Sequence, residues 1–259
     1  MADLSFFDAN CFLGRRGQPQ RNEPVDMAGL LGVMDSHRIE EALIYHVDAS
    51  VASATEGNEA LVELTGQTDR LHPCWVVMPH HTGELPEPRE LVQQMARQGV
   101  KAVRIFLKRV GPLREFLFGP LLDALAEHRI VTLLDFELGH YTQHIRDIDW
   151  DGLRWALDAY PALPIVLMRV GHSIDRTLLA LAPKFDNLYI ETSYYVGAGA
   201  LERLSGAIGA ERLLFGSGMS EFAPGPGITL VTYSGLSQGD KEKVAGGNLR
   251  RLLEGVDHS

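Results

Sequence analysis

Cysteine and long apolar runs are both scarce in this chain. Its 259 residues include only two cysteines, Cys11 and Cys74, and both stand beside apolar residues. Two thiols are too few for the disulfide framework of a secreted domain. No apolar run approaches the roughly 18 residues that a membrane-spanning helix needs, and the first residues show no basic region followed by an apolar stretch. We therefore expect a soluble, cytoplasmic protein with no membrane partner.

Clustered basic residues and nucleotide-binding motifs are missing as well. The net charge is −10, which disfavours binding to a nucleic-acid backbone. Neither a GxGxxG pattern after the first apolar run nor a GxxxxGK[ST] pattern occurs. No Ser/Gly linker, low-complexity tract or convincing repeat divides the chain. The sequence therefore predicts one domain over residues 1–259, with no nucleic-acid partner.

What the chain does contain is an alternation of short apolar runs with longer segments of helical period. Eight runs are predicted to be strands: Leu4–Asp8, Ala42–His46, His72–Met78, Ala102–Phe106, Val131–Asp135, Ile165–Met168, Leu188–Glu191 and Leu213–Gly216. Helices are predicted between and after them, at Val25–Ser36, Glu56–Thr65, Glu87–Arg97, Pro120–Glu127, Trp150–Ala159, Ser173–Leu181, Gly199–Ile208 and Asp240–Leu253. Continuous apolar runs are typical of parallel strands covered on both faces. Eight such units in about 250 residues favour a (β/α)8 TIM barrel over an open doubly wound sheet.

Five segments, in order along the chain, resemble the motifs of a known family. Phe6–Gly14 is similar to an opening strand with Asp-Ala-His-x-His followed by Leu-Gly, and Leu163–Gly171 is similar to a strand that ends in His-Leu-Gly. Asn187–Ser193 resembles Asn-x-Tyr-x-Asp-Thr-Ser, and Arg212–Gly218 resembles Arg-Ile-Leu-Phe-Gly-Ser-Asp. Gly247–Leu252 resembles a closing Gly-Asn-Ala-x-x-Leu. These motifs belong to the amidohydrolase superfamily, in its amidohydrolase-2 branch of metal-dependent hydrolases and decarboxylases, and the resemblance implies an amidohydrolase-like barrel.

The positions that hold the metal in that family carry other residues here. By the resemblance, the two opening histidines correspond to Asn10 and Phe12, and the fifth-strand histidine to Asp135. The sixth-strand histidine corresponds to Arg169 and the eighth-strand aspartate to Gly218. A zinc-like ion needs lone pairs from imidazole, carboxylate or thiolate at about 2 Å. Phe12 and Gly218 offer none, an amide is a poor ligand, and the permanent charge of Arg169 repels a cation. We therefore predict that the usual divalent-metal site is lost and that no metal cofactor is bound.

Asp135 and Arg169 are predicted to pair. Their strands are neighbours in a barrel, and the carboxyl ends of the strands converge on one mouth. A charge-assisted contact would stabilise both side chains where water is scarce. The pair is open to three interpretations: a salt bridge that plugs the vacated site, a substrate-binding pair, or a catalytic one. Arg104, inside a predicted strand, also needs a partner or a ligand, because an unpaired buried guanidinium is costly.

Other polar side chains near the predicted strand ends complete the candidate site. The candidate catalytic residues are Asp135, Arg169, His46 and Glu191. The candidate substrate-binding residues are Asn10, Phe12, Arg104, Lys108, Glu137, Tyr194 and Ser217. The three cations Arg104, Lys108 and Arg169 favour a small anionic ligand such as a carboxylate. Acid–base work would fall to Asp135, Glu137, Glu191 or His46.

The sequence leaves three functions open. The preferred one is a metal-independent hydrolase or decarboxylase that acts on a small anionic metabolite. The first alternative is a conventional metal-dependent hydrolase that binds zinc or manganese through displaced ligands: His46, His80, Asp135, Glu137 and Glu191. His140 and His144, four residues apart, are a weaker pair of candidate ligands. The second alternative is a non-catalytic ligand-binding or regulatory barrel. A homodimer is the expected assembly, because it is the commonest one.

Overall fold

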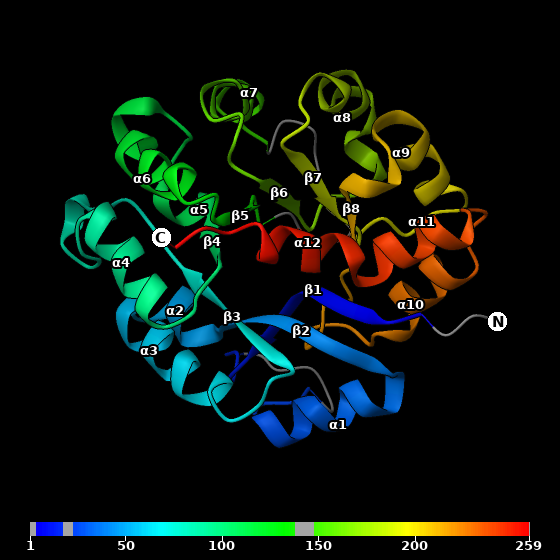
Figure 1. The fold of residues 1–259 in the computed structure, drawn as a ribbon, viewed down its shortest axis with the longest axis horizontal. Coiled ribbons are helices and arrows are strands. Elements are labelled where there is room, and N and C mark those ends of the chain that lie inside the picture. The colour runs from blue at the N-terminus through cyan, green and yellow to red at the C-terminus, as the bar shows by residue number, and fades with distance from the viewer. Residues whose placement is uncertain (1–3, 18–22, 138–147, 259) are drawn as a thin grey trace.

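Eight parallel strands form one sheet in the order β1 to β8, and helices surround it (Figure 1). The computed structural model describes residues 4–17, 23–137 and 148–258. The strands are β1 (Phe6–Leu13), β2 (Ile39–His46), β3 (Leu71–Val76), β4 (Ala102–Phe106), β5 (Val131–Asp135), β6 (Ile165–Met168), β7 (Leu188–Glu191) and β8 (Leu213–Leu214). The predicted (β/α)8 barrel is confirmed.

Helices follow the strands around the barrel. They are α1 (Met27–His37), α2 (Val47–Val51), α3 (Ala54–Thr65), α4 (Pro88–Arg97), α5 (Leu107–Val110), α6 (Glu115–Glu127), α7 (Trp150–Ala159), α8 (Asp175–Leu181), α9 (Ala200–Ile208), α10 (Gly225–Thr232), α11 (Gln238–Glu242) and α12 (Asn248–Glu254). Side-chain caps fix several starts: Asp26 accepts from Gly29 N at 2.8 Å before α1, and Asp149 accepts from Gly152 N at 3.0 Å before α7. Among the described residues, every helix is too short or too polar to cross a membrane.

The barrel closes between its first and last strands. Ala9 N donates to Phe215 O at 2.9 Å, and Phe12 N donates to Met219 O at 3.1 Å. The predicted first strand, Leu4–Asp8, ends too early, because β1 runs on to Leu13. The register against β2 shifts between Asp8 and Cys11, and the far half of β1 pairs with segments distant in the sequence. A local apolar pattern carries no signal for such pairing.

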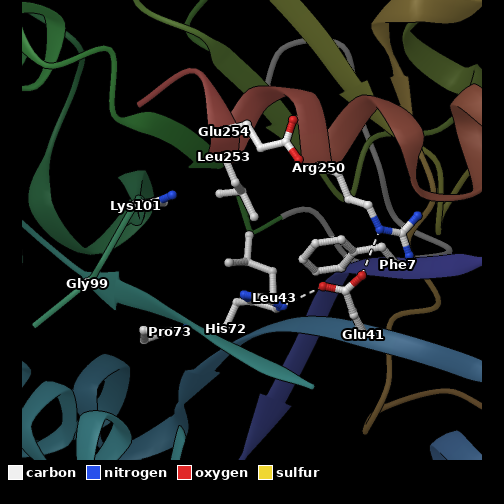
Figure 2. A pocket seen from close by; sticks show the side chains of 10 residues that line it. All are labelled: Phe7, Glu41, Leu43, His72, Pro73, Gly99, Lys101, Arg250, Leu253 and Glu254. Atoms are coloured by element: carbon white, nitrogen blue, oxygen red, sulfur yellow. Dashed lines mark hydrogen bonds and ion pairs between the residues drawn. The ribbon is translucent and has the colours of Figure 1, made fainter. Parts of the chain in front are cut away.

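Alternation along the strands sorts most buried apolar side chains into two large cores, and a small third cluster contains Val76 and Phe106. One core lies inside the barrel and includes Leu43, Cys74 and Leu133. The other, larger core lies between the strands and the surrounding helices. Leu253 of α12 packs into the interior core, and α12 crosses the barrel in front of the strands in Figure 1. Figure 2 shows Leu253 above Leu43 and Phe7, so α12 covers the end of the barrel where the strands begin.

Three further predictions of secondary structure need correction. The short helices α2 and α5, directly after β2 and β4, were not predicted. Helix α10, which follows β8, was not predicted either. The predicted helix Asp240–Leu253 is divided into α11, a π-helical segment at Lys243–Gly247, and α12. Within that segment the carbonyl of Val244 accepts from Phe215 N, just after β8, at 2.9 Å. In a regular α-helix this carbonyl would accept from a backbone N–H of the same helix.

Candidate functional site

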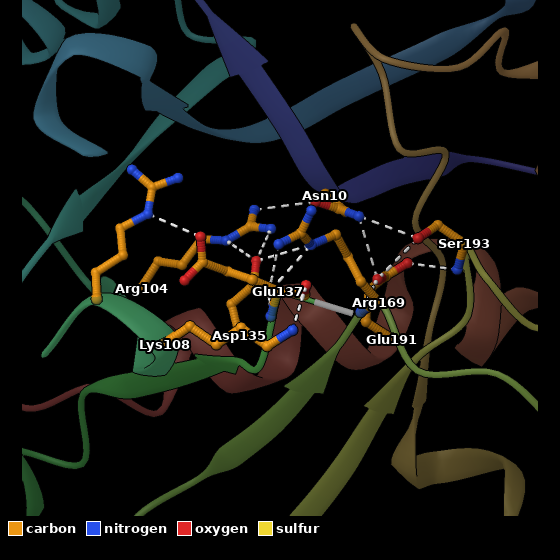
Figure 3. Close-up of polar contacts among 9 residues, drawn as sticks. Asn10, Arg104, Lys108, Asp135, Glu137, Arg169, Glu191 and Ser193 are labelled. Atoms are coloured by element: carbon orange, nitrogen blue, oxygen red, sulfur yellow. Dashed lines mark hydrogen bonds and ion pairs between the residues drawn. The ribbon is translucent and has the colours of Figure 1, made fainter. Parts of the chain in front are cut away.

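Asp135, the last residue of β5, is the centre of a polar cluster at the carboxyl ends of the strands. Its side chain is completely buried and accepts from two arginines (Figure 3). Arg104 donates to Oδ2 through Nε at 3.1 Å and Nη2 at 2.5 Å. Arg169 donates through Nε to Oδ2 at 2.9 Å and through Nη2 to Oδ1 at 2.6 Å. The predicted pairing of Asp135 with Arg169 is confirmed, and Arg104 joins it.

The three charges in this cluster do not cancel. Burial by itself would raise the pKa of Asp135, but the two guanidinium groups outweigh it and hold the pKa below its ordinary value. Asp135 is therefore ionised at neutral pH. Because arginine stays protonated in proteins, two positive groups share one negative group. The cluster keeps a surplus positive charge at the mouth of the barrel.

The two arginines differ in what surrounds them. The guanidinium carbon of Arg104 lies 4.6 Å from the centroid of the Tyr45 ring and 5.1 Å from that of Phe106, within the range of a cation–π contact. The Arg104 side chain is 3% exposed, whereas that of Arg169 is 19% exposed. Arg169 also has a φ of 55°, in the left-handed region that non-glycine residues seldom adopt. Arg169 is thus the arginine that an incoming ligand can reach.

Asn10 connects this cluster to a second buried carboxyl group. Its Oδ1 accepts from Arg104 Nη1 at 3.0 Å, and its Nδ2 donates to Glu191 Oε2 at 3.2 Å and Ser193 Oγ at 3.0 Å. Glu191, the last residue of β7, also accepts from the backbone N of Arg169 at 3.2 Å. Burial raises the pKa of Glu191, although hydrogen bonds from Ser193 oppose the rise. Glu191 is therefore the better proton holder of the two carboxyl groups.

A third buried carboxyl group, Asp8, has no role in the sequence-based predictions. Its Oδ1 accepts from the backbone N of Asn10 and of Ser217, each at 2.9 Å, and its Oδ2 pairs with the Ser217 hydroxyl. Burial raises the pKa of Asp8 to about 7, against the effect of these hydrogen bonds. Ser217, predicted to bind substrate, is instead engaged by Asp8 and by Met219 N at 2.9 Å. The sequence feature that could have indicated Asp8 is a carboxylate within an otherwise apolar strand segment, Phe7-Asp8-Ala9.

Glu137 and Lys108 lie at the rim of the cluster. The backbone N of Glu137 donates to Asp135 Oδ1 at 2.7 Å, and Lys108 Nζ donates to Glu137 O at 3.2 Å (Figure 3). Glu137 Oε1 accepts from Arg109 Nε at 2.7 Å, and Arg109 lies over the Phe106 ring. Arg109 was missed by the sequence analysis, which stopped at Lys108. Like Arg169, Glu137 has a positive φ, 51°, so two adjacent strands end in strained residues at this mouth.

The remaining predicted residues lie around the cluster or away from it. The Phe12 ring packs against Tyr45, with centroids 5.7 Å apart. Burial raises the pKa of Tyr194 to about 12, although a hydrogen bond with Arg169 and its charge oppose the rise. His46 does not join the cluster: its Nδ1 accepts from Asp48 N at 3.3 Å and caps α2. The alternation that turns Tyr45 inward sends His46 outward.

The donor set at the expected metal positions does not match the ligands of zinc or manganese. Gly218 has a φ of 73°, and a Cβ there would lie 2.7 Å from the Phe222 ring, so an aspartate would require that ring to move and would adopt a backbone conformation that favours glycine. Arg169 points its guanidinium at Asp135, the one carboxylate among these positions. Within the described ranges, no group of three or more His, Cys, Asp or Glu side chains could hold a metal ion. Of the displaced ligands, His80 lies 3.2 Å from Glu87 instead; His140 and His144 lie outside the described residues.

Eight parallel strands with a polar cluster at their carboxyl ends define an α/β barrel with its site at the mouth, an architecture shared by many enzymes. The amidohydrolase family model matches residues 12–255. The chain therefore belongs to the amidohydrolase family, as the resemblance of its strand motifs indicated. A search among curated proteins gave no match.

Solved structures share the whole fold at low sequence identity. The 2,6-dihydroxybenzoate decarboxylase from Rhizobium is 17% identical with a TM-score of 0.74, over 97% of this chain and 99% of its own. A 5-carboxyvanillate decarboxylase from Novosphingobium aromaticivorans, with bound manganese and 3-methoxy-4-hydroxy-5-nitrobenzoic acid, is 14% identical with a TM-score of 0.77, over 97% of each chain. An uncharacterized TIM-barrel protein from Bordetella bronchiseptica is 15% identical with a TM-score of 0.74, over 97% of this chain and 99% of its own. At these identities the likeness establishes the fold alone.

Proposed function

We propose that this barrel binds a small anionic metabolite at the Asp135–Arg169 cluster and hydrolyses or decarboxylates it without a resident divalent metal. Membership of the amidohydrolase family supports the reaction class. The observation that carries the metal-free part is the sharing of the Asp135 carboxylate by Arg104 and Arg169. Two fixed cations contact the one carboxylate among the expected metal positions, where a divalent ion would need lone-pair donors.

The surplus charge of the cluster supports an anionic ligand. Arg169 is the more exposed arginine, and Tyr194 hydrogen-bonds to it, so a phenol and a guanidinium lie together at the entrance. A carboxylate that approaches Arg169 gains charge-assisted hydrogen bonds and completes the charge balance of the cluster. One structural neighbour, a 2,6-dihydroxybenzoate decarboxylase, was solved with 2,6-dihydroxybenzoate, a carboxylate of this kind.

The chain's own residues then have separate tasks. Arg104 and Asp135 hold Arg169 in place, and Arg169 orients the carboxylate of the ligand. Decarboxylation needs a proton at the carbon that loses carbon dioxide, and hydrolysis needs one at the leaving group. Glu191, whose pKa is raised by burial, lies one hydrogen bond from the backbone of Arg169 and is the first candidate for this proton transfer. Glu137, at the rim, is the second acid–base candidate. His46 is not a candidate, because its side chain caps α2 and does not reach the cluster.

A non-catalytic binding barrel is the second candidate function. It is favoured because Asp135 has its hydrogen-bond partners without any ligand: the carboxylate is fully buried and accepts from two arginines and one backbone N–H. Asp135 therefore needs no substrate to complete its contacts, and Arg169 is the cation that a ligand can reach. Ligand binding without release of carbon dioxide or of a hydrolysis product would distinguish this function from the proposed enzyme.

The test combines metal content with ligand binding. The chain is purified without chelator or metal-affinity tag, its metals are measured by mass spectrometry, and 2,6-dihydroxybenzoate is titrated calorimetrically in the presence of a chelator. We expect far less than one metal per chain, and binding that weakens by about tenfold or more in Arg169→Met. The exposed Arg176→Met is the matched control and should bind as the unmodified chain does. Near-stoichiometric zinc, manganese or iron whose removal abolishes binding would refute the proposal.

A further inference from the structure

A cavity of about 260 Å³ lies at the end of the barrel opposite the mouth (Figure 2). Its walls come from the first residues of β1, β2 and β3, from the turn before β4, and from α12. The interior core, which includes Leu133 and Val166, separates this floor cavity from the Asp135 cluster. The floor cavity is therefore a separate place on the molecule, with its own lining.

One side of the floor cavity is built by a fixed network of charges. Glu41 accepts from His72 Nε2 at 2.7 Å and from Arg250 Nε at 2.7 Å. Phe7 lies between these two partners: the His72 ring is 4.8 Å from its centroid, and the Arg250 guanidinium carbon is 5.6 Å from it. The network ties α12 to β1 and β2 and holds each side chain in one orientation. The charge of Glu41 is matched within the network, whereas Glu254 of α12 is a second carboxylate on the lining, with an exposed side chain.

Two nitrogen atoms on the cavity wall have no hydrogen-bond partner among the described residues. His72 Nδ1 and Lys101 Nζ make no hydrogen bond with the described residues, and Lys101 makes no ion pair with them. The apolar part of the lining comes from Phe7, Leu43 and Leu253 (Figure 2). A small cavity with apolar walls and a few converging polar groups is the usual form of a ligand site, although drug-sized ligands need roughly 300–1,000 Å³. The floor cavity suits a smaller molecule.

We propose that the floor cavity is a second ligand site, which takes a small organic acid. The carboxylate pairs with Lys101 Nζ at the cavity wall, and a compact apolar or aromatic body lies against Phe7, Leu43 and Leu253. The recognition uses one cation, Lys101, which already lines the cavity. Arg250 and Glu41 position His72 rather than contact the ligand. The site is independent of the function proposed for the barrel mouth.

Benzoate is a suitable probe, with binding followed by the backbone amide resonances of the 15N-labelled chain. Benzoate should shift the amides of His72, Gly99 and Lys101 in a saturable way, with a Kd on the order of 1 mM. Lys101→Met should weaken that binding by about tenfold, and Lys101→Glu should abolish it, because each removes the charge that meets the carboxylate. Lys184→Met, at an exposed lysine elsewhere, is the matched control and should leave the Kd unchanged.

Arg169→Met separates this site from the barrel mouth. If both sites bind benzoate, that variant loses the shifts of residues near Asp135 and keeps those at the floor. The floor site would be overturned if benzoate at about ten times that Kd left the three amides unshifted. It would equally be overturned if the shifts were the same in Lys101→Met and Lys101→Glu as in the unmodified chain.

Discussion

Asp8→Asn should make the protein less sensitive to rising pH. In the folded chain the Asp8 carboxyl lies completely buried, with Oδ1 accepting two backbone N–H groups and Oδ2 against the Ser217 hydroxyl. An asparagine reproduces the protonated acid there: its amide oxygen accepts the same two N–H groups and its amide nitrogen donates to Ser217 Oγ. It cannot ionise. The substitution therefore removes one titration and leaves the packing and the hydrogen bonds in place.

The size of the effect follows from the rise in pKa. Burial raises the pKa of Asp8 from 3.8 to about 7, which corresponds to about 4 kcal/mol of folding free energy at most. The folded chain binds the proton up to about pH 7, whereas the unfolded chain releases it near pH 4. The stabilisation is therefore complete below pH 4 and is lost as the pH rises through 7. Between about pH 5 and pH 8, the stability of Asp8→Asn relative to the unmodified chain should rise by about 2–3 kcal/mol.

Guanidinium unfolding, followed by tryptophan fluorescence and circular dichroism at several pH values in that interval, measures this difference. Titrations of groups that do not interact with Asp8 cancel when the two are subtracted. Asp186→Asn removes an exposed carboxylate and should give a difference that stays flat. If the Asp8→Asn difference also stayed within about 0.5 kcal/mol across the interval, Asp8 would titrate normally in the folded chain, and the reasoning from its burial would be wrong.

Substitutions at Asp135 and at two glycines test the shared charge of the cluster and the close approach of two helices. Asp135→Asn leaves two arginines without their shared counter-charge and should lower the free energy of unfolding by about 3–5 kcal/mol. Adding Arg104→Met should restore part of that loss. If the costs of the two substitutions were additive, the shared charge would be contradicted. Gly57→Ala would put a Cβ 2.2 Å from Ala49 N, where α3 meets α2, and should lower stability by about 1–3 kcal/mol. Gly206→Ala, on an open face of α9, should instead raise it by about 0.5–1 kcal/mol, and equal effects at the two glycines would refute the close approach.

Much of the barrel was predictable because its strands are covered on both faces and so read as apolar runs. The bounds of β4, β5, β6 and β7 agree with those predicted. The convergence of strand ends also predicted the pairing of Asp135 with Arg169, and the cost of burying a guanidinium predicted a partner for Arg104. These inferences use only the period of a strand and the geometry of a parallel barrel.

The rest depended on contacts between distant segments. The second arginine on Asp135 and the Asn10 bridge to Glu191 require positions along the strands that apolar patterning does not fix. His46 was placed among the catalytic candidates because it ends a strand, but the one-residue alternation turns it to α2. At the opposite end, the network of Glu41 and Arg250 joins residues about 200 positions apart, which no local motif marks.

The closure of β1 by the end of the chain has a consequence for synthesis. Asp8 meets Ser217, Ser5 meets Arg250, and the backbone of Ala9 meets that of Phe215. While the ribosome makes the chain, β1 can pair with β2 on one side only, and its other edge stays open until these late segments emerge. An open strand edge is a template for association with other chains. Translation is thus the stage at which this protein has most need of a chaperone, because the first strand made is the last one to be enclosed.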